Sequence, residues 1–386
     1  IDYIVDPVIG ISSCAELQGI GSSSGNLDDD YILMSDIDCL GEGITNFDPI
    51  GSGGSGNGFV GSLDGNGFII ETLEIFSIQN SIGLVAFCED CLIKNIHVQG
   101  GDISGRYYVG GIAGISTGII QDSSYTGDLQ GSMDNVGGLV GQNFGLISRC
   151  FSEGEVTGRD KVGGLIGQGA GVVSYPNEMI ILDSYSRTNV YGEDNVGGLI
   201  GELLDADIIK SYFFGNVNVA GSNGGGFAGS ASDSSIRDSF TVNNMLGVGT
   251  KKGFIGSFGS LSGNNCYFNS NAIDSVAFAT QIFDHTLFYD YHTFFGFHDV
   301  YDRAGFEWNF DNIWSDENVG SGFPVLRSST QHFIYGCGII ITEPGEYILA
   351  NDIVDNSFTG SCIRIEGNNV VLNCDDNFIE SNNANF

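Results

Sequence analysis

The chain has 386 residues, with 60 glycines against 5 prolines and 48 Asp+Glu against 13 Lys+Arg, which gives a formal net charge of −35. This charge repels phosphate backbones and anionic lipid, so nucleic acid and membrane surfaces are excluded, and partners are expected to be neutral, cationic or bridged by metal. A hydrophobic content of 41% is too high for a disordered acidic tail, and no apolar run of about 18 residues predicts a membrane span.

Residues 1–80 are interpreted as the entry to the fold. The chain opens with Ile-Asp-Tyr-Ile and not with a basic and then an apolar stretch, so a secretion signal is expected to have been removed or to lie outside this sequence. Cys14 and Cys39 are 25 residues apart, close to the repeat length found further along the chain. A disulfide between adjacent turns of the chain is predicted if their Cα atoms lie within about 7 Å.

The segment Cys88-Glu-Asp-Cys91 has two interpretations. It could form half of a zinc site, but no second Cys or His pair lies at a suitable spacing. A local disulfide at a turn is therefore favoured. Nine cysteines, few lysines and strong acidity together predict an extracellular protein, and the odd number leaves at least one thiol unpaired within the chain.

Residues 81–270 contain a repeated element whose successive copies end 28, 27, 26, 34, 28 and 27 residues apart. The copies are SIGLVA at 81–86, VGGIAG at 109–114, VGGLVG at 136–141, VGGLIG at 162–167, VGGLIG at 196–201, GGGFAG at 224–229 and KGFIG at 252–256. Most copies are followed by an isoleucine, two further residues and then Ser or Cys. A fixed period of this length is typical of solenoids, in which each unit buries its apolar face against the next.

The units are short alternating runs bounded by Gly, Asn and Ser, which predicts strands and not helices. The predicted fold is therefore all-β, a parallel β-helix (solenoid) whose coils bond to their neighbours at about 4.8 Å. Two interior columns are expected, one of Leu84, Ile112, Leu139, Leu165, Leu199, Phe227 and Phe254 and one of Ile93, Ile120, Ile147, Ile181, Ile208 and Ile236.

Two smaller expectations follow from the repeat. Glycine pairs such as Gly163-Gly164 are predicted at corners, where glycine tolerates φ > 0 and leaves room for the backbone of the next coil. Cys150 takes the position that Ser has in most copies, and it is expected to be a small packed thiol.

Asp134, Asp160 and Asp194 hold the same position in three consecutive units, so stacking would bring three carboxylates about 5 Å apart. One interpretation is a calcium ladder, because oxygen ligands on rigid turns suit this cation. The other is a solvated edge of turn residues, with Lys161 relieving part of the repulsion between like charges, and this one is favoured. Apart from calcium, no cofactor is expected.

Residues 271–334 interrupt the repeat with an aromatic-rich segment that is expected to cap the first β-helix. Its histidines, His285, His292 and His298, have spacings that fit no standard metal-ligand pattern, so a packed segment is favoured over a metal or active site. A second pattern starts at 335, where Cys337 and Cys362 are again 25 residues apart and are predicted to be bonded. It stops mid-pattern at Phe386, so the natural chain is expected to continue or to have this end covered by a partner.

The repeat resembles the GLUG motif (Gly-Leu-any-Gly) of bacterial and archaeal surface proteins. The entry segments, such as Phe59-Val-Gly-Ser-Leu-Asp-Gly, and the closing segments Trp308-Asn-Phe-Asp-Asn-Ile-Trp and Gly322-Phe-Pro-Val-Leu extend the resemblance over about residues 10–327. The resemblance implies a right-handed β-helix in a secreted or wall-associated, adhesin-like protein, and it carries no catalytic residues. Residues 335–386 are similar to the start of a second β-helix of the kind found in surface proteins.

The sequence thus predicts an extracellular structural or adhesive protein at the cell surface, acting through self-association in a layer or filament or through a cell-surface partner. No enzymatic activity is expected, because basic residues are scattered singly and no serine-hydrolase, metalloprotease or Walker-type motif is present. The alternative is a β-helix that binds or cleaves polysaccharide, with a neutral glycan as partner. The many acids provide too many accidental pairs to select two catalytic carboxylates.

Overall fold

A computed structural model describes residues 8–21, 27–51, 57–171 and 179–269, the short segments 287–288, 313–315 and 324–326, and seven strands between residues 331 and 380. The chain divides into two compact units, Ile1–Trp308 with Val319–Phe323, and Asn309–Asn318 with Pro324–Phe386. The first unit contains the whole repeat.

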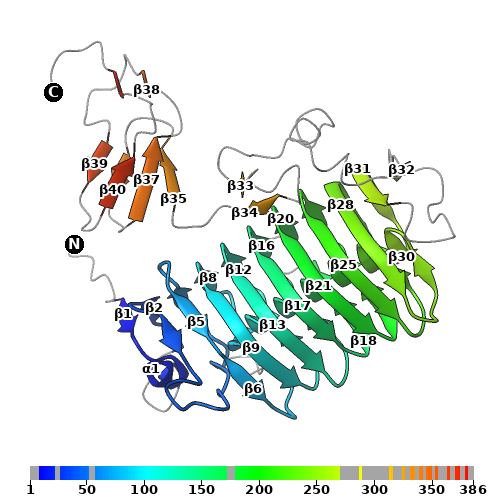
Figure 1. Ribbon diagram of the computed structural model, residues 1–386, viewed down its shortest axis with the longest axis horizontal. Helices are drawn as coiled ribbons and strands as arrows, with labels where there is room; N and C mark the ends of the chain where they lie inside the picture. The colour runs from blue at the N-terminus through cyan, green and yellow to red at the C-terminus, as the bar shows by residue number, and fades with distance from the viewer. Residues whose placement is uncertain are drawn as a thin grey trace. The chain divides into compact units, whose positions relative to one another are not determined.

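The first unit is a parallel β-helix of about seven coils (Figure 1). Every strand pair described in this unit is parallel, and each strand of the repeat pairs with its equivalent in the next coil. Ile120, for example, pairs with Ile93 on one side and with Ile147 on the other. The β-helix predicted from the repeat is confirmed.

Each coil of the repeat contributes a short strand, a long strand and two further strands. The short strands are β4 (Ser62–Asp64), β8 (Leu92–Lys94), β12 (Ile119–Gln121), β16 (Leu146–Ser148), β20 (Ile180–Leu182) and β24 (Asp207–Ile209). The long strands are β9 (His97–Gly105), β13 (Ser124–Gly131), β17 (Phe151–Thr157), β21 (Tyr185–Gly192), β25 (Tyr212–Val219), β28 (Ser234–Leu246) and β31 (Leu261–Asn269). In β28 and β31 the short and long strands are continuous, and β32 (Leu287–Phe288) pairs with the end of β31.

The remaining strands of the coils form two smaller sheets. One contains β10 (Val109–Gly110), β14 (Val136–Gly137), β18 (Asp160–Gly163), β22 (Asp194–Gly197), β26 (Gly224–Gly225) and β29 (Lys251–Lys252). The other contains β7 (Val85–Cys88), β11 (Ala113–Ser116), β15 (Val140–Asn143), β19 (Ile166–Ala170), β23 (Ile200–Leu204), β27 (Ala228–Ser232) and β30 (Ile255–Phe258).

Both interior columns predicted from the repeat are present. All thirteen of their side chains are fully buried. Backbone bonds of 2.8 and 2.9 Å join Leu139 to Leu165 and Leu165 to Leu199, and the rings of Phe227 and Phe254 stack at 4.7 Å. A further column on the long strands was not anticipated, and it consists of Ile75, Ile103, Leu129, Val156, Val190, Val217 and Met245.

The Ser or Cys after each isoleucine forms a buried ladder. Ser211 Oγ accepts the backbone N–H of Ser184 at 3.2 Å and donates to the carbonyl of Ile209 at 2.9 Å. The same pair of contacts recurs where Ser184 Oγ accepts from the N–H of Cys150. The ladder satisfies backbone donors at a corner where the sheet hydrogen bonds are interrupted, because a buried N–H without a partner is costly.

The corners differ from the sequence prediction in one respect. Gly163 and Gly164 lie outside the left-handed region, whereas Asn135, Lys161 and Asn195 have φ of 63°, 55° and 49°. The prediction that the glycine pairs supply positive φ is therefore wrong. Their other predicted role is confirmed, because a Cβ at Gly164 would overlap the carbonyl oxygen of Gly198 in the next coil.

The N-terminal entry contains a helix as well as strands. Helix α1 (Cys14–Gly19) is capped by Ser13, whose side chain accepts the N–H of Glu16. It is followed by β2 (Asp30–Leu33) and β3 (Ile37–Asp38) and preceded by β1 (Ile9–Ile11), and the entry ends with β5 (Ile69–Glu71) and β6 (Glu74–Phe76). In the described part of the chain, no helix is long and apolar enough to cross a membrane.

The disulfides predicted within the described residues are confirmed. Cys14 is bonded to Cys39, and Cys88 to Cys91, each with Cα atoms 5.1 Å apart. Cys150 is a buried free thiol, as expected, and Cys266 is a second one. Cys337 and Cys362 lie outside the described residues, so their bond stays a prediction.

In the second unit, β33 (Trp314–Ser315) pairs antiparallel with β34 (Val325–Leu326). The later strands pair in parallel: β35 (Gln331–Ile334) with β37 (Gly345–Leu349), β37 with β40 (Val370–Asn373), β36 (Ile339–Ile341) with β39 (Ile363–Ile365), and β38 (Ile353–Val354) with β41 (Ile379–Glu380). This is the pairing that a second β-helix from 335 onward requires. Most of the aromatic-rich segment 271–334, including His285, His292 and His298, lies outside the described residues.

Candidate functional site

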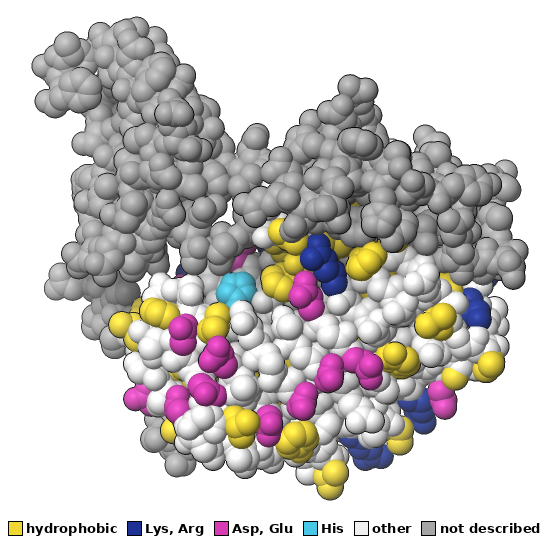
Figure 2. Space-filling model, viewed as in Figure 1, with side chains coloured by type: hydrophobic (Ala, Val, Ile, Leu, Met, Phe, Trp, Pro, Cys, Tyr) yellow, Lys and Arg dark blue, Asp and Glu magenta, His cyan; other side chains and the backbone are white. Residues whose placement is uncertain are grey.

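The outward surface of β6 and of the long strands β9, β13, β17, β21, β25 and β28, here called the long-strand face, carries a continuous row of polar side chains. Strand alternation places these side chains outward, whereas the column that includes Val156 and Val190 points into the core. The row runs in register through Glu74, Asp102, Asp128, Glu155, Asn189, Asn216 and Asn244. Figure 2 shows Asp and Glu side chains gathered over this face, with few Lys and Arg.

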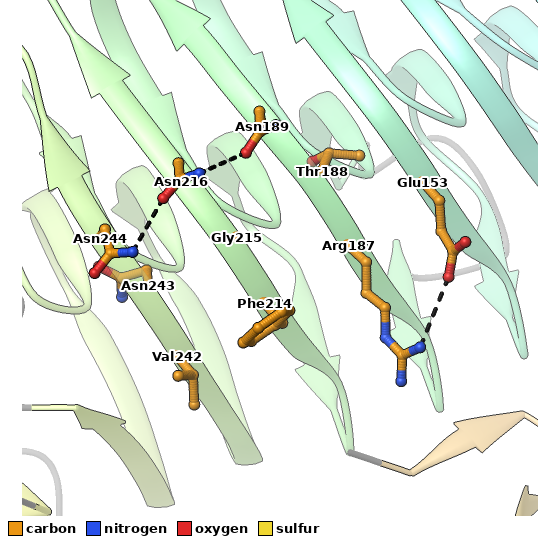
Figure 3. A pocket seen from close by; sticks show the side chains of 10 residues that line it. All are labelled: Glu153, Arg187, Thr188, Asn189, Phe214, Gly215, Asn216, Val242, Asn243 and Asn244. Carbon is orange, nitrogen blue, oxygen red and sulfur yellow. Dashed lines mark hydrogen bonds and ion pairs between the residues drawn. The ribbon is translucent and has the colours of Figure 1, made fainter. Parts of the chain in front are cut away.

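The two ends of the polar row differ in chemistry. Its first part is a run of carboxylates, and Asp128 accepts the N–H of Glu155 at 3.2 Å. Its second part is an amide ladder, in which Asn244 donates to Asn216 at 3.1 Å and Asn216 donates to Asn189 at 2.7 Å (Figure 3). The row therefore changes from acceptors alone to groups that both donate and accept.

Two shallow pockets open on the long-strand face and adjoin at β17. The first has a volume of about 460 Å³ and is lined by Glu153, Arg187, Thr188, Asn189, Phe214, Gly215, Asn216, Val242, Asn243 and Asn244 (Figure 3). The second has a volume of about 450 Å³ and is lined by Phe76, Asp102, Ile103, Ser104, Asp128, Leu129, Gln130, Glu155 and Thr157. We refer to them as the amide pocket and the acid pocket.

A ladder of aromatic rings runs beside the amide pocket. Phe151, Tyr185, Tyr212 and Phe240 stack in consecutive coils with centroids 4.9 to 5.0 Å apart. Arg187 lies over Tyr185 and Tyr212 and donates from Nε and Nη2 to the Tyr212 hydroxyl at 3.2 and 3.0 Å.

The protonation of this ladder follows from its surroundings. Burial raises the pKa of Tyr185 and of Tyr212, so both phenols are neutral at pH 7. Burial by itself would lower the pKa of Arg187, but the neighbouring Tyr212 and Tyr185, the hydrogen bond to the Tyr212 hydroxyl and the charge of Glu153 together outweigh it, and the pKa is raised. Arg187 therefore remains a fixed cation on a strongly acidic surface.

His97 and Ser124 form a contact that resembles a nucleophile and its base. His97 Nδ1 lies 2.8 Å from Ser124 Oγ, and burial lowers the pKa of His97 while the charge of Asp122 opposes this shift. Asp122 is held by Arg149 through two bonds of 2.6 Å, and Ser124 is only 3% exposed. A substrate could not reach the serine in this arrangement, so we assign the pair no catalytic role.

The three aspartates of the proposed calcium ladder lie in consecutive coils but do not share a coordination site. Asp134 pairs with Arg159 at 2.8 Å, Asp160 accepts from the side chain of Asn195 at 2.8 Å, and Asp194 accepts from Ser222 at 2.6 Å. Lys161 pairs with Glu202 and not with these carboxylates. Within the described residues no three His, Cys, Asp or Glu side chains form a metal-binding group. Calcium binding stays a prediction from the spacing alone.

Sequence reasoning did not identify the long-strand face. Its residues, such as Arg187 and Phe214, lie outside the repeated element, in strands whose outward positions vary from coil to coil. A signal was present in the sequence: Asp128, Glu155 and Asn189 lie at equal distances after the Ser or Cys position. Alignment of the complete repeat units, beyond the glycine-rich element, would have shown it.

No family model matches the chain. A stretch of 140 residues, 34% of the chain, is 34% identical to Halomucin from Haloquadratum walsbyi (strain DSM 16790 / HBSQ001). This chain covers only 2% of the length of Halomucin. Among solved structures, the chain is similar to a "putative immunoglobulin A1 protease" from Bacteroides ovatus, with a TM-score of 0.54 and 19% identity over 83% of this chain and 92% of that one.

These findings define the class of the protein as a parallel β-helix. The two disulfides, together with the partial similarity to Halomucin, fit a surface or extracellular protein. The similarity to the Bacteroides ovatus protein shows the shared fold.

The expectation that this chain is not an enzyme has to be corrected. A chain with a similar fold is described as a "putative immunoglobulin A1 protease", so this fold gives no ground for classing the present chain as a non-enzyme. The absence of sequence motifs was a weak criterion, because catalytic groups on a solenoid come together from different coils and need no local motif. At 19% identity, the likeness assigns no catalytic residue to this chain.

Proposed function

We propose that this protein is an extracellular adhesive protein of the cell surface, and that its long-strand face makes contact with an extended partner. The observation that carries the proposal is the polar row, which continues in register through seven residues from Glu74 to Asn244. A linear array of equivalent groups, each one strand spacing of about 4.8 Å from the next, suits a polymer that lies along it.

The charge of the protein supports contact with a partner that is not strongly anionic. The formal net charge is −35, and the first part of the polar row consists of carboxylates. The candidate partners are cell-envelope glycans, envelope proteins and another copy of this chain. The GLUG-type character of the repeat and assembly into a layer or filament are part of the same proposal.

The proposal is tested with purified full chain on intact cells and on isolated cell envelopes. Antibodies against the chain should label intact cells of the source organism. Sedimentation with envelopes should be reduced at least tenfold in a variant with Asp128→Lys and Glu155→Lys, which reverses charge on the face. A control variant with Glu193→Lys reverses an exposed charge between β21 and β22, outside the polar row, and should sediment like the wild type. Equal sedimentation of both variants would refute the assignment of the face, and failure to label cells would refute the location.

A second candidate is an enzymatic role in a secreted protein, and one observation favours it: the fold is shared with a protein described as a "putative immunoglobulin A1 protease". The test is incubation of the full chain with immunoglobulin A1 and with casein, followed by mass spectrometry of the products. Specific fragments that are absent from a heat-treated control would support this candidate, and intact substrates would refute it for these proteins.

A further inference from the structure

The amide pocket combines three kinds of surface. Phe214 presents part of its ring, which is 38% exposed, beside the apolar side chain of Val242. Asn189, Asn216 and Asn244 form one wall (Figure 3). Glu153 and Arg187 lie at the other end, with Glu153 Oε1 3.8 Å from Arg187 Nη1.

The amide wall keeps hydrogen-bonding capacity for a ligand. An asparagine amide has two donors and an oxygen that can accept twice. Along the ladder, Asn216 and Asn244 each use one donor on the preceding amide. The second donor of each amide, and acceptor sites on the oxygens, remain available at intervals of one strand spacing, about 4.8 Å.

These groups match the surface of a sugar ring. A pyranose has an apolar face of C–H groups and a rim of hydroxyls. The apolar face packs against an aromatic ring, and each hydroxyl needs a nearby hydrogen-bond donor and acceptor. Phe214 supplies the aromatic surface, the amides supply mixed donors and acceptors, and the Glu153–Arg187 pair adds one charged group of each sign at the other end. A volume of about 460 Å³ lies within the usual range for ligand pockets.

Charge decides between neutral and acidic sugars. Arg187 is the only cation that lines the amide pocket among the described residues, and Glu153 already lies beside it. Strand β17 also presents Glu155, and the neighbouring strand presents Asp128, so the surroundings are acidic. An anionic sugar would meet like charges, which are unfavourable at short distance.

We propose that the amide pocket is a binding subsite for neutral glycans, and that the acid pocket next to it on β17 extends the site for a longer chain. This inference rests on the proposed function, because it names the ligand class of the same face. A shallow pocket that holds one ring gives weak binding, with a Kd on the order of 1 mM for a monosaccharide. Affinity should rise at least tenfold for an oligosaccharide of three or more units, since it reaches both pockets.

The experiment is to titrate the full chain with neutral gluco-, manno-, galacto- and xylo-oligosaccharides of one to six units. Binding is measured by calorimetry and by saturation-transfer NMR. Oligogalacturonate and sialyllactose serve as acidic probes. Wild-type protein should bind at least one neutral series with the length dependence described. Phe214→Ala and Asn216→Ala should each weaken binding at least tenfold. Leu246→Ala is the matched control, because Leu246 is 44% exposed on the same face but does not line the amide pocket, and it should change binding less than twofold.

Thermal denaturation of each variant shows whether the fold is kept. Absence of binding to every neutral series at 10 mM, equal binding by wild type and Phe214→Ala, or preference for the acidic probes would each overturn the inference.

Envelope sedimentation of the same proteins separates this failure from that of the proposed function. If wild type sediments with envelopes but binds no neutral glycan, the subsite is wrong and the adhesive function stands. If it does neither, both are wrong.

Discussion

Close contact between successive coils restricts the residues that the corners accept. At Gly164 any side chain would meet the carbonyl oxygen of Gly198 and the hydroxyls of Ser186 and Thr188. At Asn195 the backbone adopts the left-handed conformation, which asparagine tolerates better than most residues. Glycine therefore provides the room that the corner needs at position 164, and asparagine provides the left-handed conformation at position 195.

Replacement of Gly164 by alanine or valine should destabilise the β-helix by about 3 kcal/mol or more, because the obstructing atoms include backbone of the next coil. The measurement is chemical denaturation followed by circular dichroism. Gly19→Ala is the control, since nothing lies within 4 Å of the added carbon at that position. Unfolding midpoints that are equal for Gly164→Ala and wild type would contradict the packing described here.

The buried free thiols give a second test at the scale of the residue. Burial raises the pKa of Cys150 to about 12, so its reactive thiolate is scarce at pH 8. Cys150 should resist iodoacetamide at pH 8 in the native protein for hours and react within minutes in 6 M guanidinium chloride. Peptide mapping by mass spectrometry follows this cysteine separately from the others. Rapid labelling in the native state would show that the thiol is accessible.

At the scale of the element, each strand is held by its neighbours in the coils above and below. The Ser and Cys ladder, the amide ladder and the aromatic ladder all repeat one contact from coil to coil, as in Tyr185 and Tyr212. Near the N-terminal end of the described residues, helix α1 with its buried Leu17 is joined by the Cys14–Cys39 bond to the residue that follows β3. The disulfide therefore cross-links helix α1 to the strands of the entry.

Removal of this bond by Cys14→Ala with Cys39→Ala should lower stability by about 2–4 kcal/mol, since it closes a loop of 25 residues. The double variant Cys88→Ala with Cys91→Ala should lose less through loop closure, because the separation there is 3 residues. Denaturant titration of both variants under the same conditions gives the comparison. A larger loss for the second pair would show that local packing, and not loop closure, dominates.

At the scale of the whole molecule, the acidic surface opposes the stacking that builds the core. The chain has a formal charge of −35, its coils lie only one strand spacing apart, and the polar row places Asp102, Asp128 and Glu155 in direct succession. Ion pairs such as Arg149 with Asp122 and Arg159 with Asp134 offset a small part of this repulsion. Thirteen basic residues cannot neutralise 48 acids.

Salt should therefore stabilise the protein. The Debye length falls from about 10 Å at 0.1 M to about 3 Å at 1 M, so repulsion between carboxylates of neighbouring coils is strongly screened. We expect Tm to rise by at least 5 °C between 0.1 and 1 M NaCl, measured by scanning calorimetry. A variant with Asp102→Asn, Asp128→Asn and Glu155→Gln should be more stable at 0.1 M and gain less from salt. A Tm that is independent of salt in both proteins would refute the argument.

The sequence by itself determined the repeat and the core. The spacing of the glycine-rich elements fixed the coil length, and the periodic Leu and Ile positions, such as Leu165 and Ile181, had to face inward because each unit can bury its apolar side only against the next. It also paired Cys14 with Cys39 correctly, since a spacing of one coil places residues side by side.

Only the tertiary structure decided which surface residues lie together. Glu153, Arg187 and Phe214 come from three coils and share one pocket because the register of the long strands aligns them, and no local motif records that alignment. Asp160 and Asp194 are in register, but the side chains of Asp134, Asp160 and Asp194 contact different partners, although their spacing suggested one site. Core residues recur at the repeat period because each unit must bury them. Outward residues are free to vary between units, so the groups that they form depend on which coils lie side by side.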